Sequence, residues 1–244
     1  MSSNLRVSEI DEQRFGIRTV RVEEVTRDDL DEIDQFCRDN DATLLIARVN
    51  VKHLDAVQRM EDDGYRLMDT LTYMKFRYNV TEIPERDPSH QIRPAVEADR
   101  DEILAIAAEA FKGYKGHYHM DPRLDDDICD EIYASWAVNS LMDKTFADDV
   151  FVVDGEEGLK GFFTVRITAP GKHGELVLSG VAPYAQKQGV YPTMLTHGLE
   201  WGREQGFRFV VASTQLTNVP VLKIFGRLGM EMHRSYYTFH KWFD

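Results

Sequence analysis

Hydrophobic and polar positions along the first 78 residues change repeatedly between the two-residue period of strands and the 3.6-residue period of helices. Apolar runs rich in β-formers predict strands, and the amphipathic stretches between them predict helices. The predicted strands span residues 15–25, 42–49 and 67–76, and the predicted helices span 28–39 and 54–60, the second ending near Gly64. This order predicts a small α/β domain over residues 1–78.

A polar segment without periodicity follows at residues 79–91 (NVTEIPERDPSHQ). It contains Pro84 and Pro88, which disfavour both a helix interior and a central strand. We interpret this segment as a linker, and we expect a second, larger domain over residues 92–244.

The pattern of the second part predicts a mixture of helices and strands. A short strand begins at Ile92, and Asp99 with Glu102 predicts a capping box at the start of a helix. A polar, aromatic loop spans residues 113–124, and the aspartates that begin at Asp125 suit the N-terminus of the next helix. The remaining predicted elements are a hairpin of strands 151–153 and 159–168, a strand at 175–181, a helix closing at Gly206, a strand at 207–212, a helix at 218–228 and a strand at 230–243.

The stretch at residues 176–201 joins a strand to a helix through a tight polar loop. An apolar run ends at Val181, a turn passes through Pro183, and a helix begins near Pro192. A helix N-terminus presents unpaired N–H groups and a positive dipole end, which together hold anions, most often phosphates. We therefore predict a pyrophosphate site formed by the intervening residues Gln186, Lys187, Gln188, Gly189, Val190 and Tyr191. Lys187 and Lys223 are candidate cations for this site.

Charge and composition narrow the class of protein. The formal net charge of −13 argues against nucleic-acid binding, which needs a concentrated basic surface. The two cysteines, Cys37 and Cys129, lack the spacing of a disulfide framework or a zinc site. His117 and His119 have no third ligand at a telling distance, so no metal is expected. Because no segment resembles a signal peptide or reaches membrane-spanning length, we expect a soluble, cytoplasmic protein without membrane partners.

Motifs for other nucleotide enzymes are missing from the sequence. It has no Gly-x-x-x-x-Gly-Lys-Ser/Thr loop for nucleoside triphosphates and no Gly-x-Gly-x-x-Gly after a strand for dinucleotides. The order of elements points elsewhere. A strand, Gln186-x-x-Gly189 opening a helix, another strand, and Asn218 opening a helix that ends in Leu228-Gly229-Met230 together resemble the GNAT superfamily of acetyl-CoA-dependent N-acyltransferases.

Further segments resemble the branch of that superfamily that contains dTDP-fucosamine acetyltransferase. They are residues 14–16, 69–71, 118–122, 214–215 and 239–243, together with Tyr133, Trp136 and Asn139. The resemblance implies a GNAT-like α+β fold, in which helices flank a mixed, mostly antiparallel central sheet beside a smaller N-terminal α/β domain. It also implies acetyl-CoA as cosubstrate, and the primary amine of a small molecule as acceptor, with a nucleotide-linked amino sugar as the leading candidate. The alternatives are a CoA-binding regulatory module without catalysis and a peptide or protein N-acetyltransferase. A homodimer remains open.

Two residues depart from the superfamily pattern. Tyr191 stands where the phosphate loop prefers Gly or Ala, so its ring has to point away from the cofactor or line its site. Phe225 stands where the superfamily often carries the tyrosine that protonates the departing CoA thiolate. Because phenylalanine has no proton to give, we consider Tyr191 and Tyr236 as replacement acids.

Acetyl transfer needs a group that takes the proton of the attacking amine. Glu175 is a candidate, since strand alternation places it on the same side as Val177 and Ser179. His119 and His240 are alternatives. The resemblance implies that two adjacent parallel strands splay near residues 180–182, where Val181 would pair with the pantetheine arm and a backbone N–H would stabilise the oxyanion.

The aromatic loop is expected to form the acceptor side of the site. It carries His117, Tyr118 and His119, whose rings suit a sugar or a nucleobase. The resemblance places Asn218 with the cofactor-binding residues of the loop at 186–191.

Overall fold

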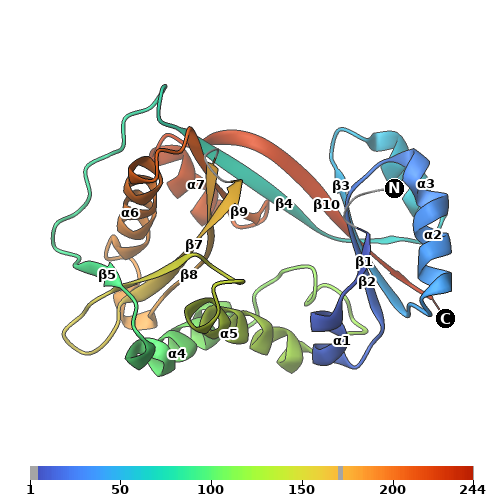
Figure 1. The fold of residues 1–244 in the computed structure, drawn as a ribbon, viewed down its shortest axis with the longest axis horizontal. Coiled ribbons are helices and arrows are strands. Elements are labelled where there is room, and N and C mark those ends of the chain that lie inside the picture. The colour runs from blue at the N-terminus through green and yellow to red at the C-terminus, as the bar shows by residue number, and fades with distance from the viewer. Residues whose placement is uncertain (1–4, 170–172, 244) are drawn as a thin grey trace.

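The computed structural model describes residues 5–169 and 173–243. In this part of the chain, ten strands form one sheet in the order β1-β2-β3-β10-β4-β9-β8-β7-β6-β5 (Figure 1). The pairs β2–β3 and β8–β9 are parallel and the other neighbours are antiparallel. The predicted class, a mixed and mostly antiparallel sheet flanked by helices, is confirmed.

The first part of the chain follows the predicted alternation. Its elements are β1 (Arg6–Val7), α1 (Glu9–Phe15), β2 (Thr19–Val25), α2 (Leu30–Asp39), β3 (Leu44–Asn50), α3 (Leu54–Asp62) and β4 (Arg66–Arg77). The expected strand over residues 15–25 begins only at Thr19. Residues before it form α1, which ends at Gly16 in the left-handed conformation (φ 64°).

The second part contains α4 to α7 and the remaining strands. Its elements are β5 (Ile92–Pro94), α4 (Arg100–Phe111), α5 (Asp126–Met142), β6 (Asp149–Val153), β7 (Gly161–Ala169), β8 (His173–Val181), α6 (Val190–Glu204), β9 (Phe209–Gln215), α7 (Val219–Arg227) and β10 (Glu231–Trp242). Helices α4 and α5 cover one face of this half of the sheet, and α6 and α7 cover the other (Figure 1).

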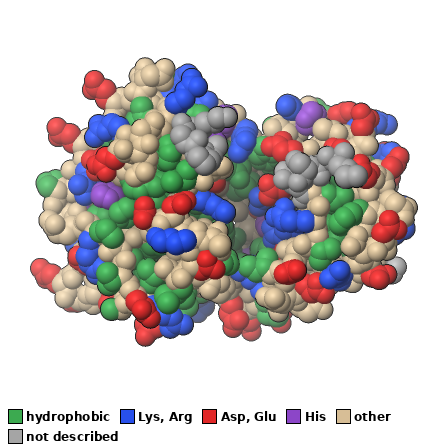
Figure 2. All heavy atoms as spheres, viewed as in Figure 1, with side chains coloured by type: hydrophobic (Ala, Val, Ile, Leu, Met, Phe, Trp, Pro, Cys, Tyr) green, Lys and Arg blue, Asp and Glu red, His purple; other side chains and the backbone are tan. Residues whose placement is uncertain are grey.

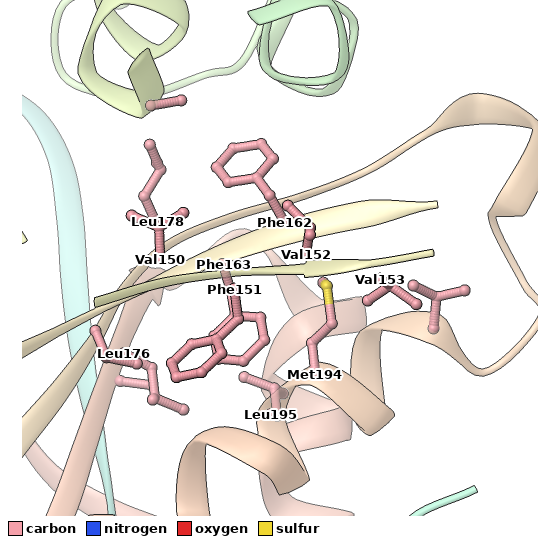
Figure 3. Close-up of a cluster of buried hydrophobic side chains, with 14 of the residues drawn as sticks. Val150, Phe151, Val152, Val153, Phe162, Phe163, Leu176, Leu178, Met194 and Leu195 are labelled. Carbon is pink, nitrogen blue, oxygen red and sulfur yellow. The ribbon is translucent and has the colours of Figure 1, made fainter. Parts of the chain in front are cut away.

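The strands of this half are apolar on both faces because helices cover both of them. Phe162 and Leu178 point toward one helical layer, whereas Phe151 and Phe163 point toward α6, beside Met194 (Figure 3). All five side chains are at most 8% exposed. Continuous apolar runs such as residues 150–153 are therefore double-sided core rather than alternating strands.

The helix starts differ in how they are capped. Asp125 accepts hydrogen bonds from the backbone N–H groups of Asp127 and Ile128, as its position predicts. The expected capping box of Asp99 and Glu102 is wrong. Asp99 accepts from the N–H of Val96, one turn earlier, and Glu102 accepts from the N–H of Leu159 on a distant loop.

The predicted linker runs along α6. Tyr78 donates from its hydroxyl to the carbonyl of Leu199 (2.7 Å), and Arg86 pairs with Glu200 (3.2 Å). On either side of this segment the sheet is continuous, since β4 pairs with both β10 and β9. A division into domains means that each part folds independently. The division at residues 79–91 stays a prediction.

Candidate active site

The parallel strands β8 and β9 diverge partway along their length. Their registered pairs run from His173 with Phe209 to Leu176 with Ala212, after which both strands continue, to Val181 and Gln215, without further pairs in the described residues. An extended ligand can pair with a strand edge opened in this way. The splay expected near residues 180–182 begins after Leu176.

A cavity of about 910 Å³ opens from this splay. Glu175, Val177, Ser179 and Val181 of β8 all line it, as alternation along the strand predicts. In the space-filling view the molecule is hollowed between the two ends of the sheet, and Lys and Arg side chains stand at the rim (Figure 2).

The loop at residues 186–191 lies beside the cavity, and two of its residues, Gln186 and Tyr191, line it. Gly189 is left-handed (φ 81°) and forms the N-cap of α6, and Lys187 also has a positive φ of 63°. Both the side chain and the backbone of Gln188 form hydrogen bonds. Its side-chain amide donates to the carbonyl of Tyr184 (2.7 Å), and its own carbonyl lies 2.9 Å from Nε2 of His90.

The other predicted loop residues do not line the cavity with their side chains. Val190 is 1% exposed and belongs to the core, whereas Lys187 points to solvent. Lys223 is also exposed, on α7. Residues 187–190 can contribute to anion binding through the backbone at the start of α6, and a role for the exposed Lys187 side chain stays a prediction.

Tyr191 occupies the opening between the two strands. With Ser179 and Phe225 it lines a second, small cavity at the splay. Burial raises the pKa of Tyr191 to about 12, and a hydrogen bond with Ser179 partly opposes this rise. The hydroxyl is therefore protonated at neutral pH and can act as an acid. Phe225 is 1% exposed.

Asn218 is the N-cap of α7 and lines the cavity. Its side-chain amide donates to Oγ1 of Thr214 (3.0 Å). Next to it, Gln215 accepts a hydrogen bond from the hydroxyl of Tyr114. These contacts tie the end of β9 to the aromatic loop, across the cavity from β8.

The predicted proton-transfer residues lie in different places. Burial raises the pKa of Glu175, and nearby Arg234, Arg166 and Arg48 only partly oppose this rise. A cavity-lining carboxyl with a raised pKa suits proton transfer. Tyr236 is not among the lining residues of the cavity, and its hydroxyl donates to Glu24.

The predicted histidines also lie in different places. His117 and its neighbour Tyr118 line the cavity, whereas His119 and His240 do not. His119 bonds through Nε2 to Asp130 (3.0 Å). His240 is 1% exposed and lies behind His117, with their ring nitrogens 3.0 Å apart.

A cationic wall is the feature that the sequence analysis missed. The charged side chains lining the cavity in the described residues are Arg6, Arg14, Arg21, Arg48, Arg166, Glu9 and Glu175. Arg21 is held by Asp11 and Tyr118, which connects the N-terminal segment to the aromatic loop. The sequence did contain a signal for this wall, because Arg48 interrupts the apolar run of β3 (LLIARVN).

Neither a metal centre nor a membrane span is found in the described part of the chain. It holds no group of three or more His, Cys, Asp or Glu side chains arranged to bind a metal ion. None of its helices is both long and apolar enough to cross a membrane.

Comparisons with known proteins show what this chain is similar to. Over 157 residues, the chain is 27% identical to spore coat polysaccharide biosynthesis protein SpsD of Bacillus subtilis (strain 168). The match covers 64% of this chain and 52% of that protein, so the chain spans about half the length of this relative.

Solved structures share the fold at low identity. A GCN5-related N-acetyltransferase from Sphaerobacter thermophilus is 17% identical with a TM-score of 0.64, over 92% of this chain and 73% of that one. A tandem GNAT protein from the clavulanic acid biosynthesis pathway is 12% identical with a TM-score of 0.65, over 93% and 76%. The model of the acetyltransferase (GNAT) family matches residues 101–230, which is more than half of the chain. This chain therefore belongs to the GNAT acetyltransferase family.

Proposed function

We propose that the protein transfers an acetyl group from acetyl-CoA to the primary amine of an anionic amino sugar, such as a nucleotide-linked one. The observation that carries this proposal is the continuity of the cavity. It runs from the splay between β8 and β9 to a wall of arginines. The similarity to a protein named for polysaccharide biosynthesis supports a sugar as the acceptor.

The cosubstrate would enter from the α6 side. The backbone around Gly189 and the start of α6 would hold the pyrophosphate, beside Gln186 and Asn218. The pantetheine arm would then lie along β8 at residues 177–181, with Val181 as its pairing partner. This arrangement brings the thioester toward Tyr191.

The acceptor would occupy the opposite end of the cavity. Five arginines and two glutamates line the cavity, whereas the whole chain carries 29 lysines and arginines and 42 aspartates and glutamates. The lining is therefore positively charged in a chain that is negatively charged overall. Guanidinium groups bind phosphate and carboxylate oxygens through paired hydrogen bonds. The lining therefore favours an acceptor that carries a negative group besides its amine, and His117, Tyr118 and Tyr114 supply rings for the sugar or base.

The chemistry requires two proton movements. The amine nitrogen attacks the thioester carbonyl carbon, the C–S bond breaks, and the thiolate leaves. Tyr191, protonated at neutral pH, would protonate the thiolate in the place of the missing tyrosine at position 225. The proton of the amine would pass to a group on the acceptor side, where Glu175 and His117 line the cavity.

The test measures CoA release from acetyl-CoA with three sets of amines: nucleotide-linked amino sugars, neutral amino sugars and peptides. We expect release with the first set and much less with the other two. Replacing Arg48 with Gln should raise the KM for the anionic acceptor by roughly 10-fold or more, since hydrogen bonds to charged groups contribute about 1.5–3 kcal/mol. The KM for acetyl-CoA should not change.

One control variant tests whether the effect of Arg48→Gln is specific, and two possible results would contradict the anionic acceptor. Arg59→Gln removes an arginine from the surface of α3, outside the cavity lining, and should leave both KM values unchanged. Equal turnover of neutral amino sugars, or turnover of peptides alone, would contradict the anionic acceptor. Phe225 favours a CoA-binding module without catalysis, and tight CoA binding without CoA release from any amine would support that alternative.

A further inference from the structure

Three buried side chains form a hydrogen-bonded row that ends at the cavity. Oδ2 of Asp121 lies 2.7 Å from Nδ1 of His240, and Nε2 of His240 lies 3.0 Å from Nδ1 of His117. Asp121, His240 and His117 are 2%, 1% and 5% exposed. Of the three, only His117 lines the cavity.

The carboxylate at the far end of the row determines where the protons sit. Burial raises the pKa of Asp121, but hydrogen bonds from His240, the backbone of Arg123 and the indole of Trp242 outweigh burial and lower it overall. The ionised Asp121 accepts from Nδ1–H of His240. With Nδ1 of His240 as the donor to Asp121, its Nε2 is the acceptor and takes the hydrogen bond from Nδ1–H of His117. His117 is thereby held with its own lone pair on Nε2.

The surroundings of His117 keep the ring neutral until the acceptor arrives. Burial lowers its pKa well below the usual range, and the charges of Arg21 on β2 and Arg48 on β3 lower it further; a charge on His240 of β10 or on His119 of the same loop would lower it again. The ring of Tyr118 packs against it, with the centroids 4.0 Å apart and the planes tilted by 35°. An anionic group bound to Arg21 and Arg48 would offset their charges, so the basicity of His117 would rise when the acceptor binds.

We propose that His117 takes the proton of the attacking amine, and that His240 and Asp121 are positioning residues that hold its tautomer. This inference rests on the proposed acetyl transfer. One proton of the bound ammonium passes to Nε2 of His117, which frees the nitrogen lone pair for attack. As the C–N bond forms and the C–S bond to CoA breaks, the nitrogen releases its second proton to solvent. The negative charge of Asp121, transmitted through His240, stabilises the imidazolium. The proton then leaves to solvent through the cavity, and Tyr191 regains from solvent the proton that it gave to the thiolate.

The first test replaces His117 with Gln, which keeps a hydrogen-bonding side chain but cannot take a proton. We expect kcat to fall by about 10²- to 10⁴-fold at pH 7, the usual contribution of a general base. The KM for acetyl-CoA should stay the same. The loss should shrink as the pH rises toward the pKa of the amine, because a free amine no longer needs a base to form. A residue that only supports the fold would not produce this recovery.

Two comparison variants separate the outcomes. His233→Gln makes the same substitution at an exposed position of β10, outside the cavity lining, and should behave as the unaltered protein. Glu175→Gln should not show the recovery at high pH. If Glu175→Gln shows it and His117→Gln keeps normal turnover, the inference is overturned while the proposed function stands. No CoA release by the unaltered protein with any amine would instead overturn the proposed function, and this inference with it.

A second measurement does not depend on the folding of a variant. Nitrogen-15 NMR of the unaltered protein distinguishes a ring nitrogen that carries a proton from one with a lone pair. We expect the lone pair on Nε2 of His117 and a proton on Nδ1 of His240. The opposite tautomer at either ring would contradict the inference.

Discussion

Tyr191 and Phe225 line the same small cavity in the opening between β8 and β9. The hydroxyl that the family often places at position 225 can therefore be supplied from α6. We predict that Tyr191→Phe lowers kcat by about 10²-fold, at the low end for a general acid because a thiolate is a tolerable leaving group. Steady-state rates of CoA release at pH 7 measure this loss.

The converse substitution provides the control. Phe225→Tyr places a hydroxyl at the wall of the same cavity, and it should restore part of the activity of Tyr191→Phe in the double variant. Thermal melts of all three variants show whether they fold. Full activity of Tyr191→Phe, with a normal melting temperature, would exclude Tyr191 as the acid.

Gly189 should be required for CoA binding because of its backbone conformation. A Cβ at this position would meet no atom closer than 3.8 Å, but the φ of 81° disfavours any residue with a side chain, and branched ones most. Gly189→Val should therefore distort the start of α6 and weaken CoA binding by at least 10-fold, measured by calorimetry.

Gly206 provides a matched control at the other end of the same helix. Its φ is 71°, and a Cβ there would have no neighbour within 4 Å. Gly206→Val should lower the stability of the protein to a similar degree and leave the affinity for CoA unchanged. Equal loss of CoA binding in both variants would mean that general destabilisation, and not the loop, explains the effect.

The contact between Asp11 and Arg21 should make a large contribution to stability. Asp11 is fully buried and also accepts from Ser8 and Tyr118. Removing one partner of a buried ion pair costs about 3–5 kcal/mol, because the other charge remains in a poor environment. Asp11→Ala should lower the free energy of unfolding by this order, measured by denaturant titration at pH 7. Asp31→Ala, which removes the exposed partner of Arg59, should have a much smaller effect.

The same network should respond to acid. Burial raises the pKa of Asp11, but the charge and hydrogen bonds of Arg21 outweigh burial, and the pKa is lowered below its usual 3.8. A carboxyl with a lowered pKa stabilises the folded state above the pKa of the unfolded chain, and this stability is lost as the pH falls below it. Unfolding measured from pH 6 to pH 2 should therefore show a steeper loss in the unaltered protein than in Asp11→Ala.

Glu175 should affect stability in the opposite sense. Its pKa is raised by burial above the usual 4.5, so the folded protein binds this proton more tightly than the unfolded chain does. The unaltered protein then loses stability as the pH rises from 4.5 through the raised pKa. Glu175→Gln removes this loss, so it should be more stable than the unaltered protein at pH 8, and the difference should disappear near pH 4. A constant difference across this range would contradict the raised pKa.

The part of the fold around β8, α6 and α7 was predictable because its signals are local. The turn after Val181, Gly189 and the amphipathic helix after it follow one another directly, and α7 begins after Asn218 as predicted. The apolar strands on either side were also placed within a few residues. In each case periodicity and turn residues are sufficient evidence within one short window.

The part of the cavity around β2, β3 and the aromatic loop depends on contacts between distant segments, which a single sequence does not reveal. His117 of the aromatic loop meets His240 of β10, 123 residues later in the sequence. Tyr118 meets Arg21 of β2 and Asp11 of α1, a seven-residue helix too short to show periodicity. The hydroxyl of Tyr236, a candidate replacement acid, donates to Glu24 on β2, a contact between distant strands that no local pattern shows. A register shift in β10 lies between Thr238 and Phe239, and irregularities of this kind are not visible in the hydrophobic pattern.

The position of β10 has a consequence for how the chain folds during synthesis. Strands β3 and β4 are consecutive in sequence, yet β10 lies between them, opposite Asn50 on one side and Leu71 on the other at Tyr236. The edges of β3 and β4 that face β10 therefore leave the ribosome unpaired, and they remain unpaired until β10 has been translated. Closing this long loop costs entropy before it gains contacts, so insertion of β10 should be a late and slow step, during which chaperones have two open edges to protect.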